Sequence, residues 1–451
     1  MKFSVREIDL FERDVRLRMP FRFGIVTLTE SPQAFARVRI RLENGAEGEG
    51  AAAELLAPKW FDKNPALTNE DNFDQLRSAL ALAKGAYLGG GANTAFGHFD
   101  AHYRGQIERG ADKGLNPLVA NYGPALIDRA LLDALCRGLG ISFYDAVRRN
   151  IAGLPLPAEF LESLRPASQI AARHTVGLVD PITSVEHRVN DGLPETLEEV
   201  VARYGHRWFK LKVGGDAKAD VERLAAIASV LDRIGEPYHA SLDGNEQYAD
   251  VDGVLELWRR MAASSRLKRL VSSIVFIEQP IKRQNALAAD VSALSREKPV
   301  IIDESDDSLD AFPRAKALGY RGVSSKTCKG LYKSLINAAR CAEWGPEYFM
   351  TGEDLTVQAG LAIQQDLALV SLLGLTHVER NGHHYVNGMA GLPAREQDAF
   401  LKAHPDLYER SHGAVRVRIS NGNLHFKSLD RPGYASGAMP DWNPMREMKI
   451  R

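Results

Sequence analysis

The stretch FKLKV at residues 209–213 places two lysines within an apolar strand. Lys210 and Lys212 stand two positions apart, so both side chains lie on one face, and the apolar residues around them lie on the other. A strand of a parallel sheet is covered on both faces and ordinarily carries no charges there. Two buried ammonium groups are costly unless they have partners. The pair therefore indicates a site inside the fold, and the alternative is an exposed edge strand with solvated lysines.

Similar short strands, each followed by a helical stretch, recur on both sides of FKLKV. They are HTVGL (174–178), HASLD (239–243), VFIEQ (275–279), VIIDE (300–304), GVSSK (322–326), YFMTG (348–352) and LTHVE (375–379). Neighbouring strands begin 22 to 36 residues apart, close to the ~31 residues of each unit when roughly 250 residues form eight βα units. Alternating strands and helices form parallel sheets. The pattern predicts an α/β fold of the TIM type, a (β/α)8 barrel.

The segments outside the barrel predict an α+β domain. Residues 2–10 and 34–42 alternate like strands, helices are expected over 70–84 and 124–138, and the glycine-rich residues 45–53 indicate a tight loop. Thr68 and Asp71 have the spacing of a helix capping box. A hairpin around Asn421-Gly422 is expected within 415–426. The predicted domains are residues 1–150, the barrel over 151–405, and a C-terminal segment, 406–451, that packs back on the first domain.

Composition narrows the possible partners and compartment. The 57 basic and 58 acidic residues give a net charge of −1, which argues against a nucleic-acid or membrane partner. The three cysteines, Cys136, Cys328 and Cys341, lack CxxC spacing, so neither a disulfide framework nor a zinc motif is expected. The N-terminus has no signal-peptide pattern and no apolar run reaches the ~18 residues of a membrane span. A cytoplasmic protein is the resulting prediction.

Three carboxylates occupy the ends of successive predicted strands. Asp243, Glu278 and Asp303 each close or follow an apolar run. The carboxyl ends of barrel strands form the mouth where barrel enzymes carry their active sites. Clustered carboxylates need a counter-charge, and their oxygens are the ligands that Mg²⁺ prefers. The sequence therefore predicts a Mg²⁺ site, with Mn²⁺ as a substitute. For a single acid, a helix cap or a satisfied loop position is the ordinary alternative.

Lys326 ends the sixth predicted strand, whereas Lys212 ends the second. In a barrel of eight strands these two positions lie on opposite sides. The two lysines are therefore expected to face each other across the mouth, with the three carboxylates between them. Taken alone, Lys326 would be read as a surface lysine.

Together these motifs resemble the enolase superfamily, and within it the muconate-lactonizing-enzyme subgroup of the mandelate racemase/muconate lactonizing enzyme family. The matching motifs are KLK (210–212), SLDGN (241–245), IEQP (277–280), IIDES (301–305) and SSKTCKG (324–330). The resemblance extends to the N-terminal domain, which looks like the capping domain of that family. A mandelate-racemase-like member would carry a histidine at the seventh strand end, where this chain has Gly352-Glu353-Asp354.

The resemblance implies a role for each site residue. Asp243, Glu278 and Asp303 would bind Mg²⁺, Lys212 and Lys326 would act as acid and base, and Lys210 would be an electrostatic partner near the substrate carboxylate. Behind them, the supporting residues would be Asn245, Gln279 and Glu304. Two further residues are predicted at the substrate. Arg22, in a capping-domain loop by family position, would bind an anionic distal group; the alternative is a solvent-facing arginine or one in an ion pair within its own domain. His383, after the eighth strand, would touch the substrate; the alternative is a solvated or structural histidine.

The implied function is removal of the α-proton of a small carboxylate to give a metal-stabilised enediolate, as in racemases, epimerases and cycloisomerases. Three alternatives stay open. A dehydratase of acid sugars or hydroxy acids would share the first step. An aldolase that forms a Schiff base would use Lys326 alone and leave the carboxylates unexplained. A non-catalytic binding module would be expected to have lost site residues, and none is missing. A homo-oligomer is a family-level expectation.

Overall fold

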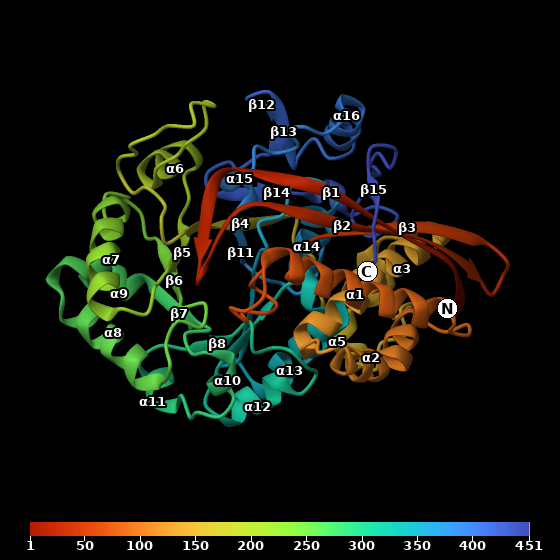
Figure 1. Cartoon of the computed structure of the whole chain (residues 1–451), viewed down its shortest axis with the longest axis horizontal. Helices are drawn as coiled ribbons and strands as arrows, with labels where there is room; N and C mark the ends of the chain where they lie inside the picture. The colour runs from red at the N-terminus through yellow and green to blue at the C-terminus, as the bar shows by residue number, and fades with distance from the viewer. Residues whose placement is uncertain (451) are drawn as a thin grey trace.

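The computed structural model describes residues 1–450 and contains the closed parallel barrel that the strand spacing predicts (Figure 1). Its strands follow one another in chain order, and the last pairs with the first. They are β4 (Gln169–Val176), β5 (Trp208–Lys212), β6 (His239–Asp243), β7 (Ile274–Glu278), β8 (Val300–Ile302), β9 (Gly322–Ser325), β10 (Phe349–Gly352) and β11 (His377–Arg380). All eight predicted strands are present, with ends shifted by up to several residues.

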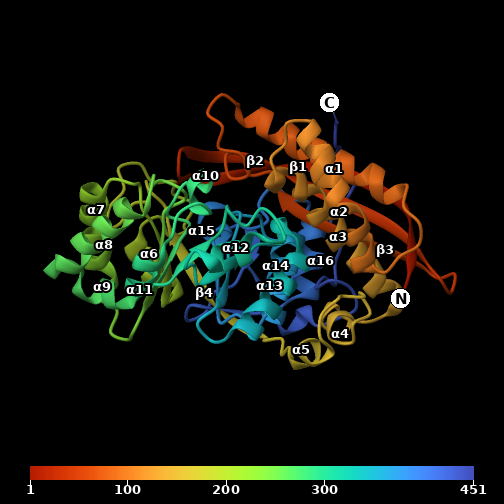
Figure 2. The ribbon, with the colours of Figure 1, turned by 90° about the horizontal axis from the view of Figure 1, so that it is seen from below.

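Helices surround the barrel wall (Figures 1 and 2). They are α6 (Leu197–Tyr204), α7 (Ala217–Leu231), α8 (Val251–Ala263), α9 (Lys268–Ser273), α10 (Arg283–Ala286), α11 (Ser292–Glu297), α12 (Ala311–Ala317), α13 (Leu331–Trp344), α14 (Leu361–Leu372) and α15 (Gly382–Tyr385). The outward side chains of FKLKV, Phe209 and Leu211, are buried in the apolar layer between strands and helices. Across residues 1–450, no helix has both the length and the apolar character that a membrane span requires.

The N-terminal domain is an antiparallel sheet packed on helices. Its elements are β1 (Phe3–Phe23), β2 (Val26–Leu42), β3 (Glu47–Leu55), α1 (Asn69–Leu88), α2 (Ala95–Asp112) and α3 (Pro117–Leu139), after which α4 (Phe143–Arg148) and α5 (Ala158–Ser163) lead to the barrel. The predicted capping box is present: the Thr68 side chain accepts from the Asp71 backbone N–H, and Asp71 accepts from the Thr68 N–H. The ribbon of β1 and β2 reaches over the barrel (Figure 2).

Residues 45–53 differ from the prediction, because most of them form strand β3 instead of a loop. Their glycines allow this strand to lie directly on helix α3. A Cβ atom at Gly48 would be 2.3 Å from the carbonyl oxygen of Ala134, and one at Gly50 would be 2.2 Å from the backbone nitrogen of Ala134. Only a residue without a side chain permits such an approach of strand to helix.

The C-terminal segment also differs from the prediction. After α16 (Ala394–Ala403), β12 (Tyr408–Ser411) pairs with β13 (Ala414–Val417), whereas β14 (Asn423–His425) pairs with barrel strand β4. The predicted turn at Asn421-Gly422 is present and is closed by reciprocal backbone hydrogen bonds between Ser420 and Asn423, but the hairpin does not extend beyond this isolated bridge. The chain then returns to the N-terminal sheet, where β15 (Arg446–Glu447) pairs with β1.

Candidate active site

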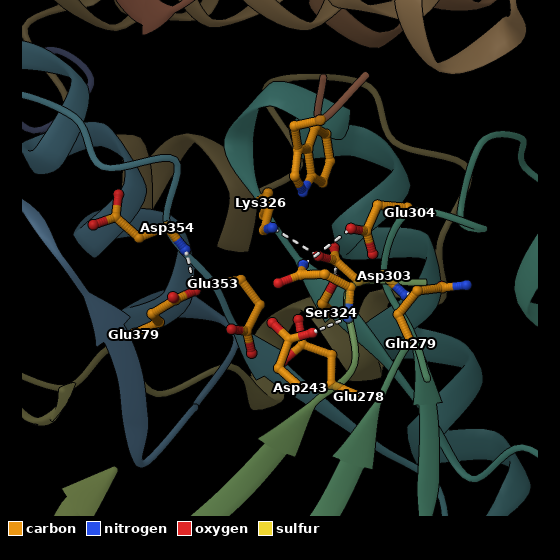
Figure 3. Close-up of polar contacts among 12 residues, drawn as sticks. Asp243, Glu278, Gln279, Asp303, Glu304, Ser324, Lys326, Glu353, Asp354 and Glu379 are labelled. Atoms are coloured by element: carbon orange, nitrogen blue, oxygen red, sulfur yellow. Dashed lines mark hydrogen bonds and ion pairs between the residues drawn. The ribbon is translucent and has the colours of Figure 1, made fainter. Parts of the chain in front are cut away.

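The three predicted carboxylates lie together at the carboxyl ends of their strands (Figure 3). Asp243 and Glu278 are the last residues of β6 and β7, and Asp303 directly follows β8. Each of the three residues has a relative exposure of 0%. The register explains their proximity, since Asp243 is directly opposite Glu278 in the paired strands. Parallel topology thus gathers charges that are far apart in the sequence.

The predicted acid–base lysines each contact one of these carboxylates. Lys212 Nζ lies 2.5 Å from Asp243 Oδ2, and Lys326 Nζ lies 2.7 Å from Asp303 Oδ2. Lys212 ends β5 and Lys326 follows β9, which are four strands apart in either direction around the closed sheet. The two amino groups therefore reach the mouth from opposite sides of the barrel.

Lys210 lies at the centre of an acidic ring. Its Nζ is 2.8 Å from Asp243 Oδ2, 2.9 Å from Glu278 Oε1, 2.7 Å from Glu353 Oε2 and 3.1 Å from Glu379 Oε2. Burial alone would lower the pKa of Lys210, but the surrounding carboxylates outweigh it and raise the pKa well above its ordinary value. Lys210 is therefore a fixed positive charge among these four carboxylates.

Two of these acids, Glu353 and Glu379, were not assigned from the sequence. Glu353 follows β10 and also accepts a hydrogen bond from Arg173. Glu379 lies within β11 and accepts from the hydroxyl of Thr175 at 2.6 Å. The signal was present for Glu379, because it ends the predicted strand LTHVE just as Asp243 ends HASLD. Applying the strand-end rule to all eight strands would have found it.

The acids of this site differ in their affinity for protons. Burial raises the pKa of Glu278 well above its ordinary value, and the negative charges of Asp243 and Glu353 raise it further. Burial acts in the same direction on Glu379, but Lys210 and Lys212 outweigh it and hold its pKa well below the usual range. Glu278 is thus the carboxylate most in need of an additional cation.

The donor set fits a hard divalent cation. Glu278 Oε2 is buried and has no hydrogen-bond partner within residues 1–450. Asp243, Glu278 and Asp303 supply only carboxylate oxygens, the ligand type that Mg²⁺ takes. The oxygens of Asp243 and Asp303 contact lysine ammonium groups at the same time. A bound cation and these ammonium groups would therefore compete for the same atoms.

The three predicted supporting residues surround this set, and of them Asn245 also lines the cavity. Gln279 Oε1 accepts the backbone N–H of Asp303 at 2.9 Å. Asn245 Nδ2 donates to Glu304 Oε1 at 3.1 Å, and Lys63 of the N-terminal domain lies 3.2 Å from the same oxygen. These contacts orient the loops that follow β6, β7 and β8.

A further buried lysine, Lys329, was not predicted. Its Nζ lies 3.2 Å from Asp303 Oδ1, 3.2 Å from Asp306 Oδ2 and 2.7 Å from the hydroxyl oxygen of Ser324. Together with Lys326, it outweighs the effect of burial and lowers the pKa of Asp303. Asp303 therefore stays ionised, held from two sides by ammonium groups.

A narrow cavity of about 20 Å³ lies between the barrel mouth and the N-terminal sheet. Its floor is lined by Lys210, Lys212, Lys326, Glu379, Asn245 and Asn381. These residues, together with Asp243, Glu278 and Asp303 that contact the lysines, are hereafter the charged floor. Its cover, hereafter the apolar roof, comprises Phe21, Phe23, Leu28, Ala57 and Trp60. The Lys326 ammonium lies 4.2 Å from the centre of the Trp60 ring, a cation–π contact between floor and roof.

The structure does not place Arg22 in this cavity. Phe21 and Phe23 line it, and residues alternate along a strand, so the Arg22 side chain projects to the opposite, exposed face of β1. The backbone carbonyl of Arg22 accepts from the N–H of Leu178 at 3.1 Å. The predicted contact between Arg22 and an anionic substrate group therefore has no support in the geometry.

His383 is also separated from the cavity. It lies in the short helix α15, is buried, and packs against His174 and His206, with ring centroids 5.3 Å from each. Adjacent β4 residues Arg173 and Thr175 contact acids inside the barrel, so His174 points outward into the helix layer. The structure thus assigns His383 to a cluster behind the barrel wall.

Comparisons with known proteins agree with this geometry. The family model described as enolase C-terminal domain-like matches residues 192–435, more than half of the chain. The fold is similar to that of 2-chloromuconate cycloisomerase from Rhodococcus opacus 1CP, with a TM-score of 0.61, 17% identity, and coverage of 97% of this chain and 98% of that one. It is also similar to the L-Ala-D/L-Glu epimerase from Bacillus subtilis, with a TM-score of 0.60, 16% identity, and coverage of 97% and 99%.

No curated protein matches the sequence. The solved structures share the barrel and its N-terminal sheet domain over nearly their whole length, and those of stated activity include a cycloisomerase and an epimerase. An isomerase or lyase is the enzyme class consistent with these relatives. The predicted superfamily and fold are therefore confirmed, and the chain belongs to the enolase C-terminal domain-like family, within the enolase superfamily.

Proposed function

We propose that the protein removes the proton next to the carboxylate group of a small acid. The observation that carries this proposal is the opposed pair Lys212 and Lys326 on the floor of one cavity, with Lys210 between them and in contact with the buried acids. A substrate carbon held between the two lysines can lose its proton to one of them as a neutral amine, and the planar carbanion that results can take a proton from the ammonium group of the other. Racemisation, epimerisation and cycloisomerisation all begin with this step.

We further propose Asp243, Glu278 and Asp303 as ligands of Mg²⁺, with Mn²⁺ as a substitute. When bound, the cation would stabilise the negative charge that develops on the substrate carboxylate. The protein's own contribution is to hold the substrate and move the proton. Lys212 or Lys326 must first release its proton to act as a base, and each now donates to a carboxylate. Drawing those carboxylates to a cation would free the lysines.

The apolar roof supports a substrate whose distal part is aromatic or aliphatic. Phe21 and Phe23 offer rings without hydrogen-bonding groups, and Trp60 adds one buried indole N–H without a partner in residues 1–450. The charged residues of the lining lie on the floor, apart from Asp354. A carboxylate group would therefore point down to the lysines and an apolar group up to the sheet. This replaces the expected anionic distal group, since Arg22 lies elsewhere.

Exchange of the α-proton in D₂O tests the proposal directly. Carboxylic acids with phenyl, alkyl and second-carboxylate distal groups would be incubated with enzyme and Mg²⁺, and the α-proton signal followed by NMR. Exchange is expected with apolar acids, and EDTA should stop it. Absence of exchange across the whole panel would contradict the proposal.

The Schiff-base alternative is distinguished by a separate measurement. An aldolase would be inactivated by borohydride in the presence of a carbonyl substrate, through reduction of the imine at Lys326. Mass spectrometry is expected to show no adduct, because Asp303 holds Lys326 as an ammonium: burial lowers the pKa of Lys326, but the charge of Asp303 outweighs it and raises this pKa. The dehydratase alternative is recognised in the D₂O experiment: loss of a β-hydroxyl group would give a new product, formed after the same removal of the α-proton.

A further inference from the structure

A second cluster of chemistry-bearing residues lies on the outer side of the barrel wall. It comprises His174 on β4, His206 just before β5, and His383 on α15. All three are at least 94% buried, with exposures of 1%, 0% and 6%. None of them lines the catalytic cavity. The proposed reaction gives these histidines no role.

The ring nitrogens of the three histidines converge. One nitrogen from each lies within 4.8 Å of the other two. His174 Nδ1 and His383 Nε2 are 3.3 Å apart. A tetrahedral Zn²⁺ site with Zn–N bonds of about 2.0–2.1 Å places neighbouring ligand nitrogens about 3.3–3.4 Å apart. The observed separation is thus that of two ligands of one ion.

The tautomer of His206 is set by a backbone contact. Its Nδ1 lies 2.9 Å from the carbonyl oxygen of Ala172, which can only accept, so Nδ1 carries the proton. Nε2 then carries a free electron pair, and it is buried without a partner in residues 1–450. A histidine that donates one N–H to a carbonyl and offers the other nitrogen is the usual form of a metal-binding imidazole.

A hydrogen-bond chain is the competing explanation. One N–H···N bond between His174 and His383 would account for their short distance. It leaves His206 Nε2 unsatisfied, together with Nδ1 of His383 and Nδ1 of the neighbouring His384. Buried polar atoms without partners are rare, and an unplaced ion is one of their recognised causes. A cation at the centre of the cluster would bind His206 Nε2, which the hydrogen-bond chain leaves without a partner.

We propose that His174, His206 and His383 bind a divalent transition-metal ion, with Zn²⁺ the best match to neutral nitrogen ligands. The fourth position is left to water or to His384, whose ring centroid is 5.0 Å from that of His174. Burial lowers the pKa of each of the three, to about 4 for His206, so the imidazoles are neutral as metal binding requires.

The position of this site suggests its consequence for the fold. β4 is the first barrel strand and α15 directly follows β11, the last, and these two strands close the barrel. The ion would join both sides of that closure to the segment before β5. Its role is structural, since Arg173 and Thr175 turn the catalytic contacts to the other side of β4.

Metal titration of the full chain tests the site. Protein stripped with EDTA would be dialysed into excess Mg²⁺, which occupies the carboxylate site, and then titrated with Zn²⁺ or Co²⁺. One equivalent of Zn²⁺ per chain is expected, with a higher melting temperature. Co²⁺ should give the intense visible bands of a tetrahedral nitrogen site, whereas a carboxylate site would give weak octahedral ones.

His206→Asn is the decisive variant, because its amide can keep the bond to Ala172 while the ligating nitrogen is lost. Zn²⁺ affinity should fall at least roughly 100-fold, beyond the loss typical of a supporting residue. The exposed His187→Asn serves as the matched control and should bind as the wild type does. If His206→Asn does not fold, His383→Asn replaces it. Wild-type protein that binds no Zn²⁺, or variants that bind it equally well, would overturn the proposal.

Discussion

The charged floor and the apolar roof of the cavity come from different parts of the chain and have opposite character. Lysines and carboxylates from six barrel strands form the reactive end, whereas β1, β2 and the loop after β3 contribute aromatic and aliphatic side chains. Floor residues are locked by ion pairs on buried strands, which fixes the chemistry. The side chains of the roof make few polar contacts, so they can be replaced without breaking ion pairs. The proposed proton transfer and the proposed substrate selection thus fall to different parts of the chain.

The strongest test of this separation is removal of a floor lysine. Lys212→Ala and Lys326→Ala should each lower turnover by roughly 10²–10⁴-fold, the usual contribution of a general acid or base. In a racemase, each variant should still exchange the α-proton of one enantiomer, with opposite preferences, as NMR in D₂O would show. The exposed Lys218→Ala is the control. If both variants lose exchange of the same enantiomer, the lysines do not work from opposite faces.

Metal binding should also depend on the floor alone. Glu278→Gln removes the carboxylate whose Oε2 lacks a partner, and Mg²⁺ affinity measured by calorimetry should drop by at least about 10–100-fold. Phe23→Leu in the roof should leave that affinity unchanged. Equal Mg²⁺ affinity in wild type and Glu278→Gln would remove Glu278 from the ligand set.

The roof should set specificity among acids. Truncation by Phe23→Ala removes apolar contact of about 1.5–3 kcal/mol, so kcat/KM for the best apolar acid should fall by roughly 10–100-fold, mainly through KM. Arg22→Met, one position away but on the exposed face of β1, should leave kcat/KM within a factor of about two. A larger effect of Arg22→Met on kcat/KM would mean that Arg22 does contact the substrate.

Acid should weaken the floor in a defined direction. Lys326 and Lys329 lower the pKa of Asp303 below its ordinary value of 3.8, so this ion pair stabilises the fold above pH 3.8 and loses that contribution as the pH falls further. For one extra proton bound by the unfolded state, the free energy of unfolding falls by about 1.4 kcal/mol for each unit by which the pH is lowered. Urea unfolding at several pH values should show a shallower acid slope for Asp303→Asn. An unchanged slope would mean that another group governs acid unfolding.

Much of the floor was predictable because barrel topology converts position into proximity. Recognising the strand ends was enough to predict that Asp243, Glu278 and Asp303 lie together. The two-residue spacing of Lys210 and Lys212 likewise placed both side chains on the inner face of the barrel. Their roles as ligands and bases remain predictions. Glu353 and Glu379 were overlooked, although Glu379 obeys the same rule. Here the information was present in the sequence.

The roof was not predictable to the same extent, because the direction in which its side chains point depends on strand pairing between residues far apart in the sequence. The ladder between β1 and β2 is interrupted between Arg16 and Phe21, and this irregularity decides which side chains of the β1 end face the barrel. Sequence alternation alone allows Arg22 or its neighbours to point inward. His383 depended likewise on a four-residue helix that turns it behind the wall. Such local irregularities leave no periodic signal.

The contact of Gly48 and Gly50 with helix α3 gives these two small residues control over reactivity at a distance. β3 rests on α3 at these glycines and carries Glu54, which accepts a hydrogen bond from Thr327 at 3.0 Å, one residue after Lys326. α3 also holds the same loop through Asn121, which donates to the carbonyl of Lys329 at 2.8 Å. A single added methyl group would push strand and helix apart and shift the loop that carries Lys326. A substitution at Gly48 or Gly50 would therefore be expected to change activity through this loop, although neither residue lines the cavity.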